Sequence, residues 1–208
     1  MQALLLDFNG TLSEDEPLLC QIFQELFEEA GKPLTEEEYY EQLAGFSDAE
    51  IIRMWLGRDD PALLRRKSAR YGELADGSTV SEEARAAMRW ATERAVLGIV
   101  SGSAREEIEP VLEVAGIRDA FAVLVSVDDI RRSKPDPEGY LLALHLLGVV
   151  SGDAAAIEDS EAGVAAAKAA GLFCAAVTTT LPPERLSEAD QLAERVDRDL
   201  IARLLSAM

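Results

Sequence analysis

Acidic residues in this sequence follow short apolar runs, where they could carry chemistry. Asp7 follows the apolar residues 4–6 and enters a turn that contains Gly10. A carboxylate there could attack phosphorus as a nucleophile or bind a metal ion, although an Asp ahead of a glycine also commonly caps a turn. Glu158 and Asp159 follow another apolar run, and such adjacent acids suit Mg²⁺, which binds through one or two carboxylates. As an alternative, this pair could complement the dipole of a following helix.

Hydroxyl, glycine and lysine side chains follow two further apolar runs. Ser101, Gly102 and Ser103 come after residues 96–100 and precede a helical pattern, so a hydroxyl and backbone N–H groups could bind an anion there. The two serines could also be simple helix N-caps. Lys134 is followed by two closely spaced prolines, and a lysine pointing inward there would neutralise phosphate charge and keep a carboxylate nucleophile ionised. A solvated loop lysine is the ordinary alternative.

The elements that must position these residues alternate along the chain. Short apolar runs without internal alternation indicate strands that are buried on both faces of a parallel sheet, and amphipathic helical patterns lie between the later runs. The predicted strands are residues 4–6, 96–100, 121–125, 154–157 and 173–177, and the predicted helices are residues 82–94, 104–115, 137–147 and 161–170. The alternation predicts an α/β fold, a doubly wound parallel sheet with a Rossmann-like core.

Residues 15–78 interrupt this alternation and read as helices alone. Apolar residues recur at helical spacing near the start of this stretch, and Thr35 with Glu38 fits a capping box at a helix start. We therefore predict an all-helical domain inserted into the α/β core. Its predicted bounds are residues 15–78, the core comprises residues 1–14 and 79–208, and the return hinge lies at residues 77–79.

The chemical motifs occur in a fixed order on successive predicted strands. Ligands bind at the carboxyl ends of the strands in a doubly wound sheet, so these residues should meet at one edge. With its motifs in this order, the chain resembles the haloacid dehalogenase-like hydrolase superfamily. The resemblance is strongest to the branch that contains β-phosphoglucomutase and small-molecule phosphatases with a helical cap. The matching segments are residues 7–12 (Asp-Phe-Asn-Gly-Thr-Leu), 99–103 (Ile-Val-Ser-Gly-Ser), 134–137 (Lys-Pro-Asp-Pro) and 157–164 (Ile-Glu-Asp-Ser-Glu-Ala-Gly-Val).

The resemblance implies a phosphoryl-transfer reaction that depends on a metal ion. Asp7 would attack the phosphoryl group and give an aspartyl-phosphate, which water then hydrolyses. Mg²⁺ would be held by Asp7, by the main-chain carbonyl of Asn9, and by Glu158 and Asp159. Lys134 would complete a catalytic set with Asp7 and Asn9.

The resemblance also implies where substrate is held. Ser101, the Gly102 N–H group and Lys134 would bind phosphate oxygens. The inserted helical domain would be a cap that closes over the site and selects the substrate. The loop that corresponds to the family's substrate-specificity loop is residues 44–48, and its candidate specificity residues are Gly45, Phe46 and Ser47.

Asn9 departs from the family pattern. Phosphatases of this family carry a second Asp there, which protonates the leaving oxygen and then activates the attacking water, whereas an amide delivers no proton at neutral pH. Three explanations stay open. The substrate could have a good leaving group, such as an acyl or aryl phosphate; a cap residue could supply the acid; or the protein could bind a phosphorylated ligand with little catalysis. The candidate cap donors are Tyr39, Tyr40 and Glu41.

Sibling activities of the superfamily fit the sequence less well. Dehalogenases work without a metal, a mutase needs the second Asp, and phosphonatases use a Schiff-base lysine in the cap. The insert contains Lys32 and Lys67, but neither lies in a matching motif. The prediction is a Mg²⁺-dependent phosphohydrolase acting on a small phosphorylated metabolite. A weakly catalytic phospho-ligand-binding protein and a phosphomutase- or phosphonatase-type relative remain the alternatives.

The composition limits the partners of the 208-residue chain. Its 39 acidic and 20 basic residues give a formal net charge of −19, which argues against a nucleic acid or an anionic membrane as partner. No apolar run approaches the ~20 residues that a membrane span needs, and the first residues lack the basic flank of a signal peptide. We expect a cytoplasmic protein that is a monomer or a weak dimer.

Overall fold

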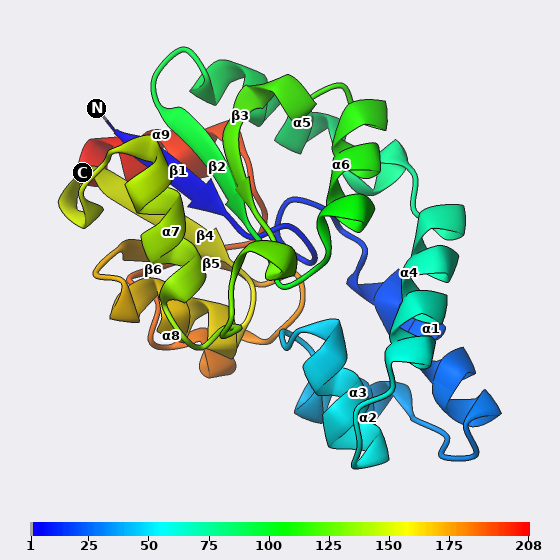
Figure 1. The fold of residues 1–208 in the computed structure, drawn as a ribbon. Helices are drawn as coiled ribbons and strands as arrows, with labels where there is room; N and C mark the ends of the chain where they lie inside the picture. Colours follow the sequence, from blue (N-terminus) through cyan, green and yellow to red (C-terminus); the bar gives the residue numbers. More distant parts are fainter. Residues whose placement is uncertain (1) are drawn as a thin grey trace.

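A computed structural model describes residues 2–208 and shows one parallel six-stranded sheet (Figure 1). The strand order is β3-β2-β1-β4-β5-β6, and each neighbouring pair is parallel. The strands are β1 (Ala3–Leu6), β2 (Val96–Val100), β3 (Phe121–Val125), β4 (Ala154–Glu158), β5 (Phe173–Val177) and β6 (Gln191–Ala193). The predicted α/β fold with a parallel sheet is confirmed, and β6 is an edge strand that the apolar runs did not predict.

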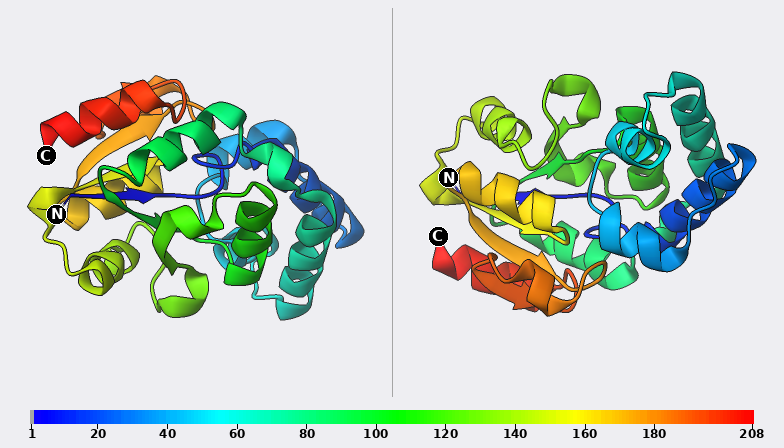
Figure 2. Two further views of the ribbon diagram at one scale, coloured as in Figure 1. Left: turned by 90° about the horizontal axis from the view of Figure 1, so that it is seen from above. Right: turned by 90° about the horizontal axis from the view of Figure 1, so that it is seen from below.

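Helices cover both faces of the sheet, which explains why its central strands contain almost only apolar residues. Figure 2 shows α5 and α9 on one side of the sheet and α7 on the other. α7 packs on β2 and β3, and α8 packs on β5. These helices are α5 (Glu82–Ala91), α6 (Arg105–Val114), α7 (Glu138–Leu147), α8 (Glu161–Ala169) and α9 (Arg198–Ala207). The predicted helix over residues 82–94 is three residues too long, because residues 92–94 form a turn into β2, and α9 was not predicted.

Four further helices between β1 and α5 form a group that we call the helical segment (residues 16–74). They are α1 (Glu16–Glu29), α2 (Glu36–Gln42), α3 (Asp48–Leu56) and α4 (Pro61–Leu74). The Thr35–Glu38 capping box forms as predicted at the start of α2. The rings of Phe23 and Phe27 stack in the core of the segment, and the Trp55 ring packs against Phe27 at a tilt. The group lies beyond the carboxyl ends of the strands (Figure 1).

Short 3₁₀ turns join several of these elements, and one of them occupies the predicted return hinge. They are η1 (Gly77–Thr79), η2 (Arg118–Ala120), η3 (Val127–Asp129), η4 (Ser151–Asp153) and η5 (Pro183–Leu186). Among the helices that the structure describes, none is both long and apolar enough to cross a bilayer.

A buried ion triad joins the helical segment to the core. Lys67 on α4 is fully buried, and its Nζ lies 2.8 Å from Oδ2 of Asp48 and 2.6 Å from Oε2 of Glu107. Asp48 begins α3, whereas Glu107 belongs to α6 of the core. The two carboxylates raise the pKa of Lys67 against the effect of its burial, so the ammonium stays charged and holds both acids.

Removing this ammonium should destabilise the fold. Lys67→Met leaves two carboxylates without a counter-ion, and breaking a buried pair in this way costs about 3–5 kcal/mol. We expect a loss near the lower limit, since the Asp48 side chain is 12% exposed and can be hydrated. Urea unfolding of the variant measures the change. Arg66→Met on the same helix is the control, because Arg66 makes an exposed pair with Glu29 and should cost below about 1 kcal/mol. Equal losses in the two variants would contradict the assigned role of Lys67.

Candidate active site

Asp7 leaves the carboxyl end of β1 and lies against Glu158, which ends β4, and Asp159, which follows it. Its backbone N–H donates to the carbonyl of Ile157 at 2.9 Å, which extends the β1–β4 pairing by one residue. The chain then turns through Gly10, whose φ of 70° lies in the left-handed region. A Cβ at Gly10 would lie 2.1 Å from Oδ2 of Asp159. The absence of a side chain at this position therefore lets the two segments approach closely.

Three buried carboxylates gather at this edge of the sheet. Asp7, Glu158 and Asp159 each offer an oxygen, and these oxygens lie within 4.8 Å of one another. Oε2 of Glu158 is buried and has no hydrogen-bond partner among residues 2–208. Burial raises the pKa of Glu158 to about 7 and, together with the charge of Asp7, raises that of Asp159. An unpaired buried oxygen among clustered acids fits a hard cation with oxygen ligands.

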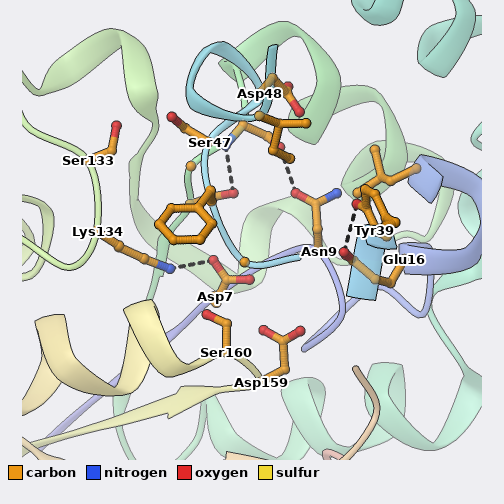
Figure 3. A pocket seen from close by; sticks show the side chains of 17 residues that line it. Asp7, Asn9, Glu16, Tyr39, Ser47, Asp48, Ser133, Lys134, Asp159 and Ser160 are labelled. Atoms are coloured by element: carbon orange, nitrogen blue, oxygen red, sulfur yellow. Dashed lines mark hydrogen bonds and ion pairs between the residues drawn. The ribbon is translucent and has the colours of Figure 1, made fainter. Parts of the chain in front are cut away.

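Lys134 provides the positive charge at the acid cluster. Its Nζ lies 2.5 Å from Oδ1 of Asp7 (Figure 3). The same Nζ lies 2.6 Å from Oε1 of Glu158. The hydroxyl of Tyr140 donates to the same Glu158 oxygen at 2.5 Å. One ammonium facing three carboxylates leaves a net charge of about −2 when all are ionised. A bound divalent cation would neutralise that remainder.

The loop after β2 brings the predicted phosphate-binding residues to the same pocket. Ser101 and Gly102 line it together with Asp7 and Lys134. The Ser101 hydroxyl accepts from the backbone N–H of Ser103 at 3.1 Å, which fixes the start of the turn. A backbone N–H beside a buried hydroxyl at the end of a strand is suited to hold an anion.

Asn9 is held on both sides of its amide. Its Oδ1 accepts from the Ser103 hydroxyl at 2.7 Å, and its Nδ2 donates to Oδ2 of Asp15 at 2.9 Å. Asp15 also accepts from the backbone N–H of Gly10 at 3.2 Å and from the hydroxyl of Tyr71. The Asn9 side chain therefore bridges the loops after β1 and β2 and has no acidic proton to donate.

The loop between α2 and α3 closes the pocket from the helical segment. Gly45, Phe46 and Ser47 all line it, in the place where the resemblance puts the specificity loop. A Cβ at Gly45 would lie 2.4 Å from Cβ of Ser160, and one at Gly102 would lie 3.6 Å from Cα of Ser47. The helical segment and the core are thus in direct contact at the rim of the pocket.

Glu16 lines the pocket but is not indicated by the sequence analysis, whereas Asp48 ends the predicted specificity loop. Each lies in the first turn of a helix, where an acid is ordinarily interpreted as a complement to the helix dipole. Oε1 of Glu16 accepts from the hydroxyl of Tyr39 at 2.8 Å (Figure 3). Of the three donors considered for the missing acid, Tyr39 lines the pocket but already donates to Glu16, whereas Tyr40 and Glu41 are not among the lining residues.

Comparison with known proteins places the chain in a family. The family model for haloacid dehalogenase-like hydrolases matches residues 1–171. Validoxylamine A 7'-phosphate phosphatase from Streptomyces hygroscopicus subsp. limoneus is 33% identical over 194 residues, which cover 90% of this chain and 91% of that protein. The Phosphorylated carbohydrates phosphatase of Thermotoga maritima is 30% identical, with 83% and 82% covered.

A solved structure agrees in the fold. A CbbY variant from Rhodobacter sphaeroides, in complex with xylulose-(1,5)bisphosphate, has a TM-score of 0.82 and is 29% identical, with 94% of each chain covered. The order of the motifs, the sheet that positions them and the match over most of the chain agree with one another. The chain belongs to the haloacid dehalogenase-like hydrolase family, and its relatives include named phosphatases.

Proposed function

We propose that the protein is a Mg²⁺-dependent phosphohydrolase that releases phosphate from a small phosphorylated metabolite through an aspartyl-phosphate at Asp7. The observation that carries the proposal is the contact of the Asp7 carboxylate with Lys134, within a cluster of buried acids at the carboxyl ends of two adjacent strands. The named phosphatases among the relatives support it.

The residues of the pocket divide the work of phosphoryl transfer. An Asp7 oxygen forms a bond to phosphorus as the bond from phosphorus to the leaving oxygen breaks. Water then attacks the phosphorus of the aspartyl-phosphate, which releases phosphate and restores the carboxylate. Ser101, the Gly102 N–H and Lys134 hold the phosphate oxygens as negative charge redistributes over them.

The metal site in this proposal consists of Asp7, Glu158, Asp159 and the main-chain carbonyl of Asn9. Mg²⁺ bound there supplies positive charge beside the phosphoryl oxygens. The chain's own contribution is to keep the three carboxylates close together, through Gly10 and the Tyr140 hydroxyl on Glu158. The helical segment acts as the cap that excludes water, because Gly45 and Ser47 reach the core loops.

The leaving oxygen requires a proton that Asn9 does not supply. An activated ester, whose leaving group departs without protonation, is therefore turned over more readily than an alkyl ester. The fixed amide of Asn9 favours one second candidate, a phospho-ligand-binding protein with weak catalysis. The Schiff-base chemistry of a phosphonatase fits less well, since Lys67 is tied to Asp48 and Glu107.

Phosphate release from p-nitrophenyl phosphate and from a panel of sugar phosphates tests the proposal. Release should depend on added Mg²⁺ and should stop when EDTA is added. Turnover that is unaffected by the chelator would overturn the metal assignment. Mg²⁺-assisted binding of panel members without any turnover would favour the second candidate instead.

Metal binding should also appear as stabilisation of the fold. At a free Mg²⁺ concentration 100 times its Kd, binding to the native state alone adds about 2.7 kcal/mol to the free energy of unfolding. Thermal unfolding with and without Mg²⁺ measures this increment. Asp159→Asn should lose most of it, whereas the exposed control Glu188→Gln should keep it. The increment is compared rather than the starting Tm, because removing one of three clustered like charges itself changes the metal-free stability.

A further inference from the structure

Only one end of the pocket has a lysine or arginine among the lining residues that the structure describes. At the sheet end, Lys134 lines the pocket together with Ser101, Gly102 and the acids Asp7 and Asp159. At the end formed by the helical segment, the polar lining side chains include Glu16, Tyr39 and Asp48, beside apolar ones. Lys134 is the only lysine or arginine among the lining residues of the described chain, and it is already paired with Asp7 and Glu158. The end away from the phosphate site therefore has acids and no free cation.

Glu16 is the residue at this end whose carboxyl is available to a ligand. It is 6% exposed, it points into the pocket (Figure 3), and it accepts one hydrogen bond, from Tyr39. Its second oxygen accepts none from residues 2–208, and no lysine or arginine in that range forms an ion pair with it. Burial raises the pKa of Glu16 to about 8. A buried carboxyl with a free oxygen at a pocket wall is suited to a ligand that donates hydrogen bonds.

Asp48 adds a second acid to this end of the pocket, and we call Glu16 and Asp48 together the acidic wall. The Asp48 carboxylate is held by Lys67, but Lys67 also pairs with Glu107. A single positive charge is therefore shared between two carboxylates. Asp15, next to Glu16 in the chain, is buried as well. A phosphate or carboxylate placed here would face like charges at short range in a poorly hydrated site.

From this arrangement we infer the substrate class: a phosphomonoester whose leaving group presents hydroxyl or ammonium donors to Glu16 and Asp48 and carries no second anionic group. The inference rests on the proposed phosphohydrolase function and names its substrate. Carboxylate oxygens accept hydrogen bonds from both kinds of donor, and an ammonium beside Glu16 also favours its ionised form against the effect of burial. A second anion loses affinity because no lining cation compensates it.

A neighbouring groove is the alternative place where a second anionic group of the substrate could bind. Arg53, Arg131 and Arg132 line it, and it shares Ser47 and Ser133 with the pocket. Arg53 is paired with Asp59, and Arg132 with Asp136 and Glu138. Two of the three arginines are thus already neutralised, which favours the acidic wall as the determinant of specificity.

Four sugar phosphates with a similar six-carbon frame test the inference. Glucose 6-phosphate is neutral and glucosamine 6-phosphate is cationic away from the phosphate, whereas 6-phosphogluconate and glucose 1,6-bisphosphate carry a second anion. We expect kcat/KM for the first two to exceed that for the last two at least tenfold. The ratio of glucosamine 6-phosphate to glucose 6-phosphate distinguishes ammonium from hydroxyl recognition. Kd values measured by calorimetry on Asp7→Asn protein give the same ranking without relying on turnover.

Glu16→Gln assigns the discrimination to this wall. The amide keeps the size of the side chain but cannot ionise, so the preference over the two anionic substrates should shrink at least fivefold. Glu14→Gln, an exposed change two residues away, should leave it unchanged. Equal or better use of the bisphosphate, or a preference that Glu16→Gln does not alter, would overturn the inference. If the wild-type protein prefers the bisphosphate and Arg131→Ala abolishes that preference, the neighbouring groove binds the second anion instead.

The two proposals fail separately. If p-nitrophenyl phosphate is hydrolysed in an Mg²⁺- and Asp7-dependent manner without discrimination between the sugar phosphates, the inference is wrong and the phosphohydrolase proposal stands. If no ester is turned over but the Kd values show the predicted ranking, the wall is assigned correctly and the phosphohydrolase proposal is wrong.

Discussion

Asn9→Asp should raise kcat for an alkyl phosphate such as glucose 6-phosphate by about 10²–10⁴-fold, the usual contribution of a general acid. The physical reason is the contact between the Asn9 amide and Asp15 at 2.9 Å. A carboxyl in the same place faces the buried Asp15 carboxylate, and that like charge raises its pKa, so that it retains a proton to donate. The gain should be much smaller for p-nitrophenyl phosphate, whose leaving group requires little protonation.

Steady-state kinetics of the two substrates measure the effect. Asn9→Ser is the matched control, because it removes the amide without supplying an acid and should give no gain. If Asn9→Asp leaves the alkyl phosphate rate unchanged or lowers it, the site is adapted to an amide and the interpretation of Asn9 as a missing acid is wrong. The circular dichroism spectrum of the variant shows whether it is folded and so separates that outcome from misfolding.

Asp7→Asn should lower kcat for p-nitrophenyl phosphate by about 10⁴–10⁶-fold, in the range seen when an enzyme loses its nucleophile. The amide has nearly the same shape but cannot form the bond to phosphorus. It also relieves the mutual repulsion of three carboxylates whose oxygens lie within 4.8 Å of one another, so the fold should persist. Loss of activity in a folded protein is therefore expected.

Two measurements make this result specific. Mass spectrometry of acid-quenched wild-type protein should detect a phosphoryl adduct on the peptide that contains Asp7, and the variant should have none. Glu188→Gln, exposed and remote from the pocket lining, should keep wild-type turnover. Activity that survives Asp7→Asn would mean that another residue is the nucleophile.

The sheet could largely be predicted from sequence because a parallel strand buried on both faces has a distinctive composition. The runs at Val96–Val100, Phe121–Val125 and Phe173–Val177 match the observed strands residue for residue. β6 lacks this signal, because it is three residues long, begins with Gln191 and lies at the sheet edge, where Leu192 is 42% exposed. Such a strand forms through pairing with β5, which a local pattern does not encode.

The candidate site likewise contains some residues that the sequence predicts and others that it does not. The meeting of Asp7, Lys134 and the two acids at the end of β4 follows from strand ends that share one edge. Glu16 could not be found by that rule, since its place depends on how α1 packs against α2 and presents Tyr39. Tyr39 shows the converse, because its hydroxyl was considered as a proton donor to substrate and is instead bonded to Glu16.

The Lys67 triad has a consequence for preorganisation. Because this ammonium holds Asp48 at the pocket wall and Glu107 on the core helix at the same time, the helical segment cannot move away without separating buried opposite charges. Contact between the two walls is therefore a property of the protein before any ligand binds. Less of the binding free energy is then used to order the pocket, and more of it remains for discrimination between ligands.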